Sequence, residues 1–90
     1  MRISAEPLPS GCKLLRLHPG DGVEYIAYTI MKPISTTECE LVGFKFDGVT
    51  IQRVRLALTE CAKAGYDYCH ITRKKGETVV KTRFSLGRYK

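Results

Sequence analysis

The sequence predicts a small α+β domain in which an antiparallel sheet of about five strands packs against one helix. Five short stretches have the composition or the period of two expected of strands, whereas one stretch repeats apolar residues at steps of three and four. A chain of 90 residues buries only about 60 percent of its unfolded surface and supports one core. We therefore expect a single domain over residues 1–90.

The first ten residues are predicted to be an extended lead-in. Pro7 and Pro9 cannot donate a backbone hydrogen bond, and each disfavours helix in the residue before it. The first strand is expected over residues 12–17. His18 and the turn-forming residues 19–22 follow it, so we expect His18 to be a solvated loop residue.

Two further strands are expected before the helix. Residues 23–31 are rich in aromatic and β-branched side chains on both faces, which favours a central strand. Residues 38–46 alternate more clearly. The large side chains Val42, Phe44 and Phe46 share one face of this strand and are predicted to point into the core.

The helix is expected after Asp47, which is placed to cap its N-terminus. Gly65 stands where a left-handed C-terminal cap belongs. The apolar stripe of this helix consists of Ile51, Val54, Leu58 and Cys61.

Two strands, residues 66–73 and 78–84, complete the predicted sheet. In the first, Cys69 and Ile71 are expected to face inward. In the second, the residues expected to face the core are Val80 and Phe84, with Leu86 beyond, and those expected to face away are Val79, Lys81 and Arg83. The order is β-β-β-α-β-β, and the connections between strands are short enough for antiparallel pairing.

Positive charge is concentrated in the last twenty residues. They carry seven basic side chains against one acid, Glu77, whereas the first seventy residues carry eight of each sign. A neutral body with a cationic end directs its field to one surface, so we expect an anionic partner. Lysines on an exposed hairpin also maintain solubility and block edge pairing, and this alternative stays open.

The leading functional hypothesis is contact with the backbone of DNA or RNA by a basic C-terminal hairpin. Cations on such a ribbon neutralise phosphates, and an aromatic ring can stack on a base. The chain has no asparagine and a single glutamine, Gln52, so we expect backbone contacts rather than sequence reading. The candidate nucleic-acid-binding residues are Arg73, Lys74, Lys75, Lys81, Arg83, Arg88, Tyr89 and Lys90.

The alternative is a protein inhibitor or adaptor, of the type found among phage and mobile-element accessory proteins, that docks on an acidic or nucleic-acid-handling protein. Leu56 projects opposite the apolar stripe of the helix, among polar and cationic groups. Most isolated exposed leucines have no role, and the sequence leaves that reading open, as it does homodimerisation through a free sheet edge. The candidate protein-binding residues are Arg53, Arg55, Leu56 and Lys63.

The four cysteines are expected to be reduced core residues rather than disulfides or metal ligands. No pair shows the short Cys-x2-4-Cys spacing with which one turn presents two zinc ligands. Cys69 and His70 are neighbours on a strand and point to opposite faces. No cofactor or metal is therefore predicted.

Neither catalysis nor membrane insertion is predicted. The acidic residues are scattered, and only Glu38 and Glu40 share a strand face, where they more often keep an edge soluble than act as a catalytic pair. No apolar run approaches the roughly 18 residues that span a bilayer, and the first residues lack the apolar centre of a secretory signal. A non-catalytic protein of the cytoplasm is the resulting expectation.

Overall fold

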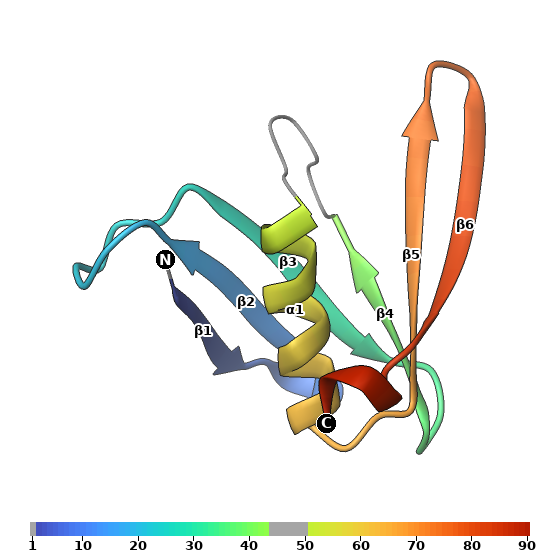
Figure 1. Ribbon diagram of the computed structural model, residues 1–90, viewed down its shortest axis with the longest axis horizontal. Helices are drawn as coiled ribbons and strands as arrows, with labels where there is room; N and C mark the ends of the chain where they lie inside the picture. The colour runs from blue at the N-terminus through green and yellow to red at the C-terminus, as the bar shows by residue number, and fades with distance from the viewer. Residues whose placement is uncertain (1, 44–50) are drawn as a thin grey trace.

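The computed structural model describes residues 2–43 and 51–90 (Figure 1). The helix α1 spans Ile51–Lys63, and two short 3₁₀ turns lie at Pro9–Gly11 and Gly87–Tyr89. Within the described residues, no helix is long and apolar enough to cross a membrane. The strands are β1 (Arg2–Pro7), β2 (Lys13–His18), β3 (Ala27–Pro33), β4 (Glu38–Val42), β5 (Tyr68–Lys75) and β6 (Thr78–Ser85).

The expected α+β class is confirmed, but the sheet has six strands rather than about five and is mixed rather than antiparallel. The strands lie in chain order, with β1 and β6 at the two edges. All neighbours are antiparallel except β4 and β5, which run parallel. The helix α1 lies in the connection between these two strands, and such a crossover returns the chain to the end of the sheet from which it started. β5 therefore runs in the same direction as β4.

The sixth strand is β1, which occupies the segment expected to be a lead-in. It pairs antiparallel with β2, and Ile3 lies opposite Leu17 while Ala5 lies opposite Leu15. Pro7 ends the strand at the edge of the sheet, where its missing N–H costs no bond within the ladder. The prolines thus limit the length of β1 but do not prevent it.

The core lies between α1 and one face of the sheet, and no helix of the described residues covers the other face (Figure 1). Side chains alternate along each strand, so one residue in two points to α1. Cys69, Ile71 and Leu86 are buried, as the sequence predicted. The buried apolar residues are Leu15, Leu17, Met31, Cys39, Leu41, Ala57, Leu58, Cys61, Ala62, Cys69, Ile71 and Leu86.

The strand expected over residues 23–31 is shorter and less buried than predicted. β3 begins at Ala27, and Val23 is 91% exposed. The residues before β3 form a loop that folds back on β2, where the N–H of Ile26 donates to the carbonyl of Leu17 over 2.9 Å. The aromatic and β-branched residues Val23, Tyr25 and Ile26 therefore lie in this loop and are exposed, instead of forming the start of a buried strand.

The predicted orientation of β4 is wrong. Cys39 and Leu41 are buried beneath α1, whereas Val42 is 40% exposed. Phe44 and Phe46 lie outside the described residues. The prediction assigned the larger side chains to the core, but the small thiol and Leu41 face the helix.

The C-terminus of α1 is capped as predicted. Gly65 has a φ of 96°, its N–H donates to the carbonyl of Ala62, and the N–H of Tyr66 donates to the carbonyl of Cys61. This pair of bonds satisfies two carbonyls that have no partner within the helix. The proposed N-cap, Asp47, lies outside the described residues.

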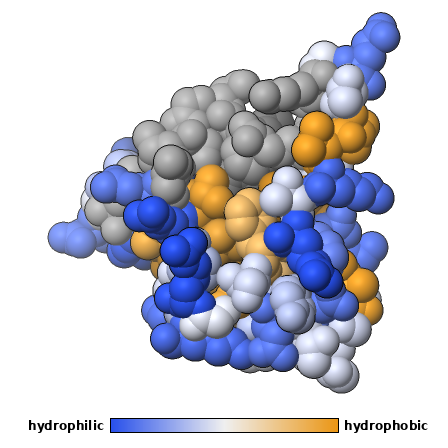
Figure 2. Space-filling view, turned by 45° about the vertical axis from the view of Figure 1, so that its right-hand side comes forward, coloured by the Kyte–Doolittle hydropathy of each residue, from blue (hydrophilic) through white to orange (hydrophobic). Residues whose placement is uncertain are grey.

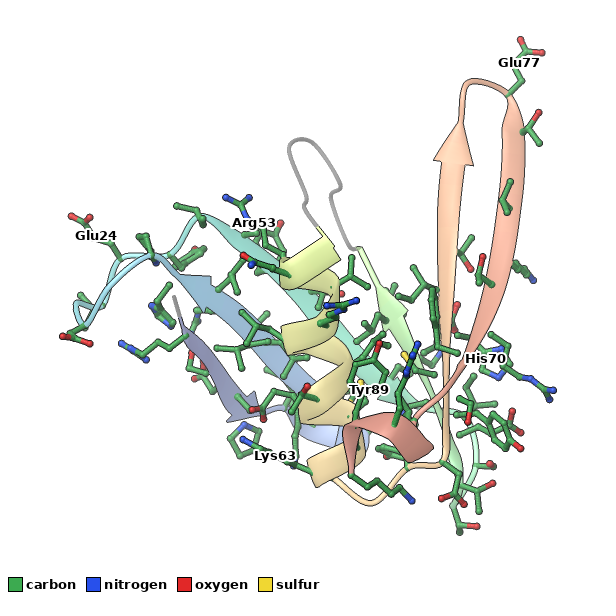
Figure 3. The ribbon with its side chains drawn as sticks, in the orientation of Figure 1. Glu24, Arg53, Lys63, His70, Glu77 and Tyr89 are labelled. Carbon is green, nitrogen blue, oxygen red and sulfur yellow. The ribbon has the colours of Figure 1, made fainter. Side chains whose placement is uncertain are left out.

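The hairpin of β5 and β6, residues 68–85, is referred to below as the basic hairpin. It projects beyond the rest of the sheet, with Glu77 at its tip (Figure 3). Its strands pair up to Lys75 and Thr78, and Gly76 takes a φ of 60° in the short turn. The prediction that Val80 points into the core is wrong, because this side chain, although on the same face as Phe84, is 43% exposed.

Candidate functional site

The two cations of β6 that the sequence predicted to face away from the core do so. Lys81 lies opposite Thr72, and Arg83 lies opposite His70, on the face of the sheet that carries no helix. Both side chains are exposed. Because they are two residues apart on one strand, their Cα atoms are separated by about 7 Å.

Arg83 is held in place by an aromatic ring. Its guanidinium carbon lies 4.7 Å from the centre of the Tyr68 ring, which is a cation–π contact. Next to it, His70 contacts the carboxylate of Glu38 with an Nε2–Oε1 distance of 2.8 Å. Glu38 is thus engaged by His70, and among the described residues no carboxylate pairs with the guanidinium of Arg83.

The last three candidate residues lie apart from β6, around the 3₁₀ turn Gly87–Tyr89. Tyr89 is partly buried and packs against the core beside α1 (Figure 3). Lys90 pairs with Asp67, with an Nζ–Oδ1 distance of 2.5 Å. Only Arg88 of this group is an exposed cation without a carboxylate partner among the described side chains.

A shallow hollow connects this turn with β6. Its polar groups are the side chains of Arg83 and Arg88 and the hydroxyl of Ser85, and Phe84 and Tyr89 complete its lining. Two guanidinium groups and a hydroxyl on one concave surface suit a phosphate group, which accepts bidentate hydrogen bonds from arginine.

The remaining predicted cations of the hairpin are placed by their backbone alone. Arg73, Lys74 and Lys75 form the last part of β5 and pair with Val80, Val79 and Thr78 respectively. Their side chains lie outside the described part of the structure.

Figure 2 shows that apolar atoms lie beneath the hydrophilic tip of the basic hairpin. Val79 and Val80 are both exposed there. The hairpin therefore offers cations interleaved with apolar side chains, rather than a uniformly charged ribbon.

Two exposed tyrosines that the sequence did not single out lie near β2 and β3. Tyr25 and Tyr28 are each about half exposed and meet edge to face, with ring centres 6.4 Å apart. The guanidinium of Arg16 lies 5.5 Å from the Tyr25 ring. Tyr28 lies on the same face of the sheet as Arg83, so this face carries exposed aromatic rings that Tyr89 does not supply. The placement of Tyr28 on this face depends on the register of β2 with β3, which the sequence alone does not determine.

Of the four candidate protein-binding residues on α1, the structure brings only two together in one hollow. Arg55 and Leu56 line a shallow hollow with Gln52 and Thr59. Lys63 lies about 10 Å further along the helix axis and contacts Glu60 over 3.5 Å. Arg53, in the first turns of α1, does not line that hollow (Figure 3).

His18 is not the solvated loop residue that was predicted. It ends β2 and is buried. Its Nε2 lies 2.7 Å from the hydroxyl of Ser4, and its Nδ1 lies 2.8 Å from the carbonyl of Glu24. The imidazole therefore links β1, β2 and the loop before β3, which is a structural role.

Three of the four cysteines converge in the core. Cys39 on β4, Cys61 on α1 and Cys69 on β5 are each 0% exposed, and their sulfur atoms all lie within 4.8 Å of one another. Hydrogen bonds from the thiols of Cys61 and Cys69 lower the pKa of Cys39, and the same bonding together with burial raises the pKa of Cys61 and of Cys69. Spacing along the chain could not reveal this cluster, because it depends on the parallel pairing of β4 with β5.

No protein-family model matches the chain, and neither a curated protein nor a solved structure is significantly similar to it.

Proposed function

We propose that this protein is a non-catalytic binding protein that contacts the phosphate backbone of nucleic acid through the basic hairpin. The observation that carries the proposal is the projection of the hairpin with Lys81 and Arg83 exposed on one face. Neither side chain forms an ion pair with a described carboxylate. An unneutralised pair of cations on a protruding ribbon attracts a polyanion and is sterically free to lie along it.

The spacing of the cations fits a phosphate backbone. The Cα atoms of Lys81 and Arg83 are separated by about 7 Å, so their long side chains can reach neighbouring phosphates of one backbone at the same time. The hollow lined by Arg83, Arg88 and Ser85 offers a third phosphate position at the base of the hairpin. We propose that Tyr28, rather than Tyr89, supplies an aromatic surface when bases are unpaired.

Salt dependence tests this proposal directly. Binding that neutralises about five phosphates weakens by roughly 10²–10³-fold when salt rises from about 50 to about 200 mM. We expect such a slope when fluorescent duplex and single-stranded oligonucleotides of random sequence are titrated with the protein. Absence of binding at low salt would contradict the proposal.

A matched pair of variants separates the hairpin from net charge. Lys81→Gln/Arg83→Gln and Arg55→Gln/Lys63→Gln each replace one lysine and one arginine, the second pair at exposed positions of α1, which covers the other face of the sheet. We expect the first variant to weaken binding and to reduce the salt slope by about two, since each phosphate contact contributes about one. Equal loss of affinity in both variants would assign binding to overall charge and refute the hairpin site.

A second candidate function rests on the hollow of α1. We propose, as the alternative, that Arg55 and Leu56 dock an acidic protein surface, because an apolar side chain beside a cation lines this concave patch. Leu56→Asp should then abolish a pull-down complex. Val23→Asp is the matched control, since Val23 is an exposed apolar residue away from α1. A complex that survives Leu56→Asp removes the helix from consideration.

A further inference from the structure

The three-cysteine cluster brings together side chains from three separate elements. Cys39 and Cys69 are directly paired in the parallel register of β4 and β5, and Cys61 reaches them from α1. All three cysteines belong to the buried core that α1 forms with the sheet. The sulfur atoms of Cys61 and Cys69 are 3.9 Å apart.

These distances match those required for one shared metal ion. With a metal–sulfur bond of about 2.3 Å, three sulfurs around one ion are separated by about 4 Å. The Cys61–Cys69 pair already meets this separation, and all three sulfurs lie within 4.8 Å of one another. Each sulfur therefore needs to move by less than about 1 Å, which side-chain rotation alone can supply.

We propose that Cys39, Cys61 and Cys69 form a three-thiolate site for one soft metal ion, and that it takes Cu(I) in preference to Zn(II). Thiolates select soft ions, of which Cu(I) and Zn(II) are the common biological choices. Zn(II) takes four ligands, and the fourth is a protein side chain or water. The cluster of potential ligands contains only three described residues, and their complete burial leaves no open position for water. Cu(I) is stable with three sulfur ligands and needs no fourth.

Binding at this site would connect the base of the basic hairpin to the rest of the sheet. Cys69 lies at the start of β5, Cys39 lies on the neighbouring strand, and Cys61 lies near the C-terminal end of α1. Each bound thiol releases its proton to solvent. Because the sulfurs are sealed from solvent, the ion has to enter while α1 is undocked, so binding is coupled to folding.

The test uses the full chain, refolded from denaturant under anaerobic reducing conditions with Cu(I). We expect one Cu(I) per chain to be retained against a Cu(I)-selective chelator. X-ray absorption should report three sulfur neighbours, and the melting temperature should rise by about 5 °C or more. No retained copper, a copper with only two sulfur neighbours, or a complex with Zn(II) of equal or higher affinity would overturn the proposal.

Cysteine variants locate the site. Cys12 is the matched control, because it is only partly buried and its sulfur is outside the cluster. We expect Cys12→Ala to retain the copper, Cys39→Ala to weaken binding about tenfold or more, and Cys39→Ala/Cys69→Ala to abolish it. Circular dichroism of the metal-free variants checks folding. If a variant does not fold, the copper stoichiometry, sulfur number and melting shift of the natural sequence still decide the outcome. Equal copper affinity of Cys12→Ala and Cys39→Ala would refute the assignment.

Discussion

The two halves of the basic hairpin differ in environment although they share the same strands. At its base, Cys69 and Ile71 of β5 are fully buried beneath α1. Toward the tip, every residue of β6 from Thr78 to Lys81 is exposed. The alternation of side chains continues through both halves, so burial is decided by whether a helix covers the strand and not by the pattern itself. One half stabilises the fold, and the other is available for binding.

The largest loss of stability is expected from a substitution at the buried base of the hairpin. Leu86, which follows β6, is 0% exposed, and Leu86→Ala removes buried methyl groups and leaves a cavity. We expect the free energy of unfolding to fall by about 2–5 kcal/mol, as measured by urea denaturation. A loss below about 1 kcal/mol would contradict the assignment of this residue to the core.

A smaller loss of stability is expected from backbone strain at two glycines. Comparing them tests whether the tip of the hairpin unfolds independently of the rest of the molecule. Gly65 and Gly76 both have positive φ, and a Cβ at either position meets no atom within 4 Å. Alanine should therefore cost only the left-handed conformation, about 1 kcal/mol. We expect Gly65→Ala to lower the free energy of unfolding by this amount. Gly76→Ala should lower it less, because the exposed tip can open locally.

Urea denaturation measures both glycine variants. The control is Gly22→Ala, since Gly22 lies in the loop before β3, has no positive φ, and has no atom within 4 Å of an added Cβ. It should leave stability nearly unchanged. Equal losses for Gly65→Ala and Gly76→Ala would show that the hairpin tip unfolds only together with the rest of the molecule.

The smallest effect is expected at Val80, which the alternation had assigned to the core. Val80 is exposed rather than part of the core, so Val80→Ala should change the free energy of unfolding by less than about 0.5 kcal/mol. The same denaturation experiment used for Leu86→Ala measures it. A loss comparable with that of Leu86→Ala would mean that the outer half of the hairpin is covered by another surface in solution.

The sequence predicted the features that depend on local chemistry. The inward orientation of Val54, Leu58 and Cys61 of α1, the Gly65 cap and the inward orientation of Cys69 and Ile71 follow from periodicity and backbone preference, and all are observed. The outward orientation of Lys81 and Arg83 followed from the same alternation. The segregation of charge could be counted directly along the chain.

The features that the sequence did not predict depend on which elements become neighbours. Alternation shows that two faces of β4 differ, but only the position of α1 decides that Cys39 and Leu41, rather than Val42, are buried. Similarly, β1 is stable because β2 offers it a partner, in spite of its prolines. Lys90 has a body carboxylate, Asp67, beside it only after the chain has folded. The cysteine cluster forms only because β4, α1 and β5 all become neighbours.

The parallel pairing of β4 with β5 also determines how the molecule can be divided. Residues 2–42 associate with one another through nearest-neighbour antiparallel strands, and residues 51–90 contain the helix and the last two strands. Two peptides produced by cleavage between Gly43 and Ile51 would thus carry complementary surfaces. We expect them to reassemble on mixing, at a rate that depends on the concentration of both fragments.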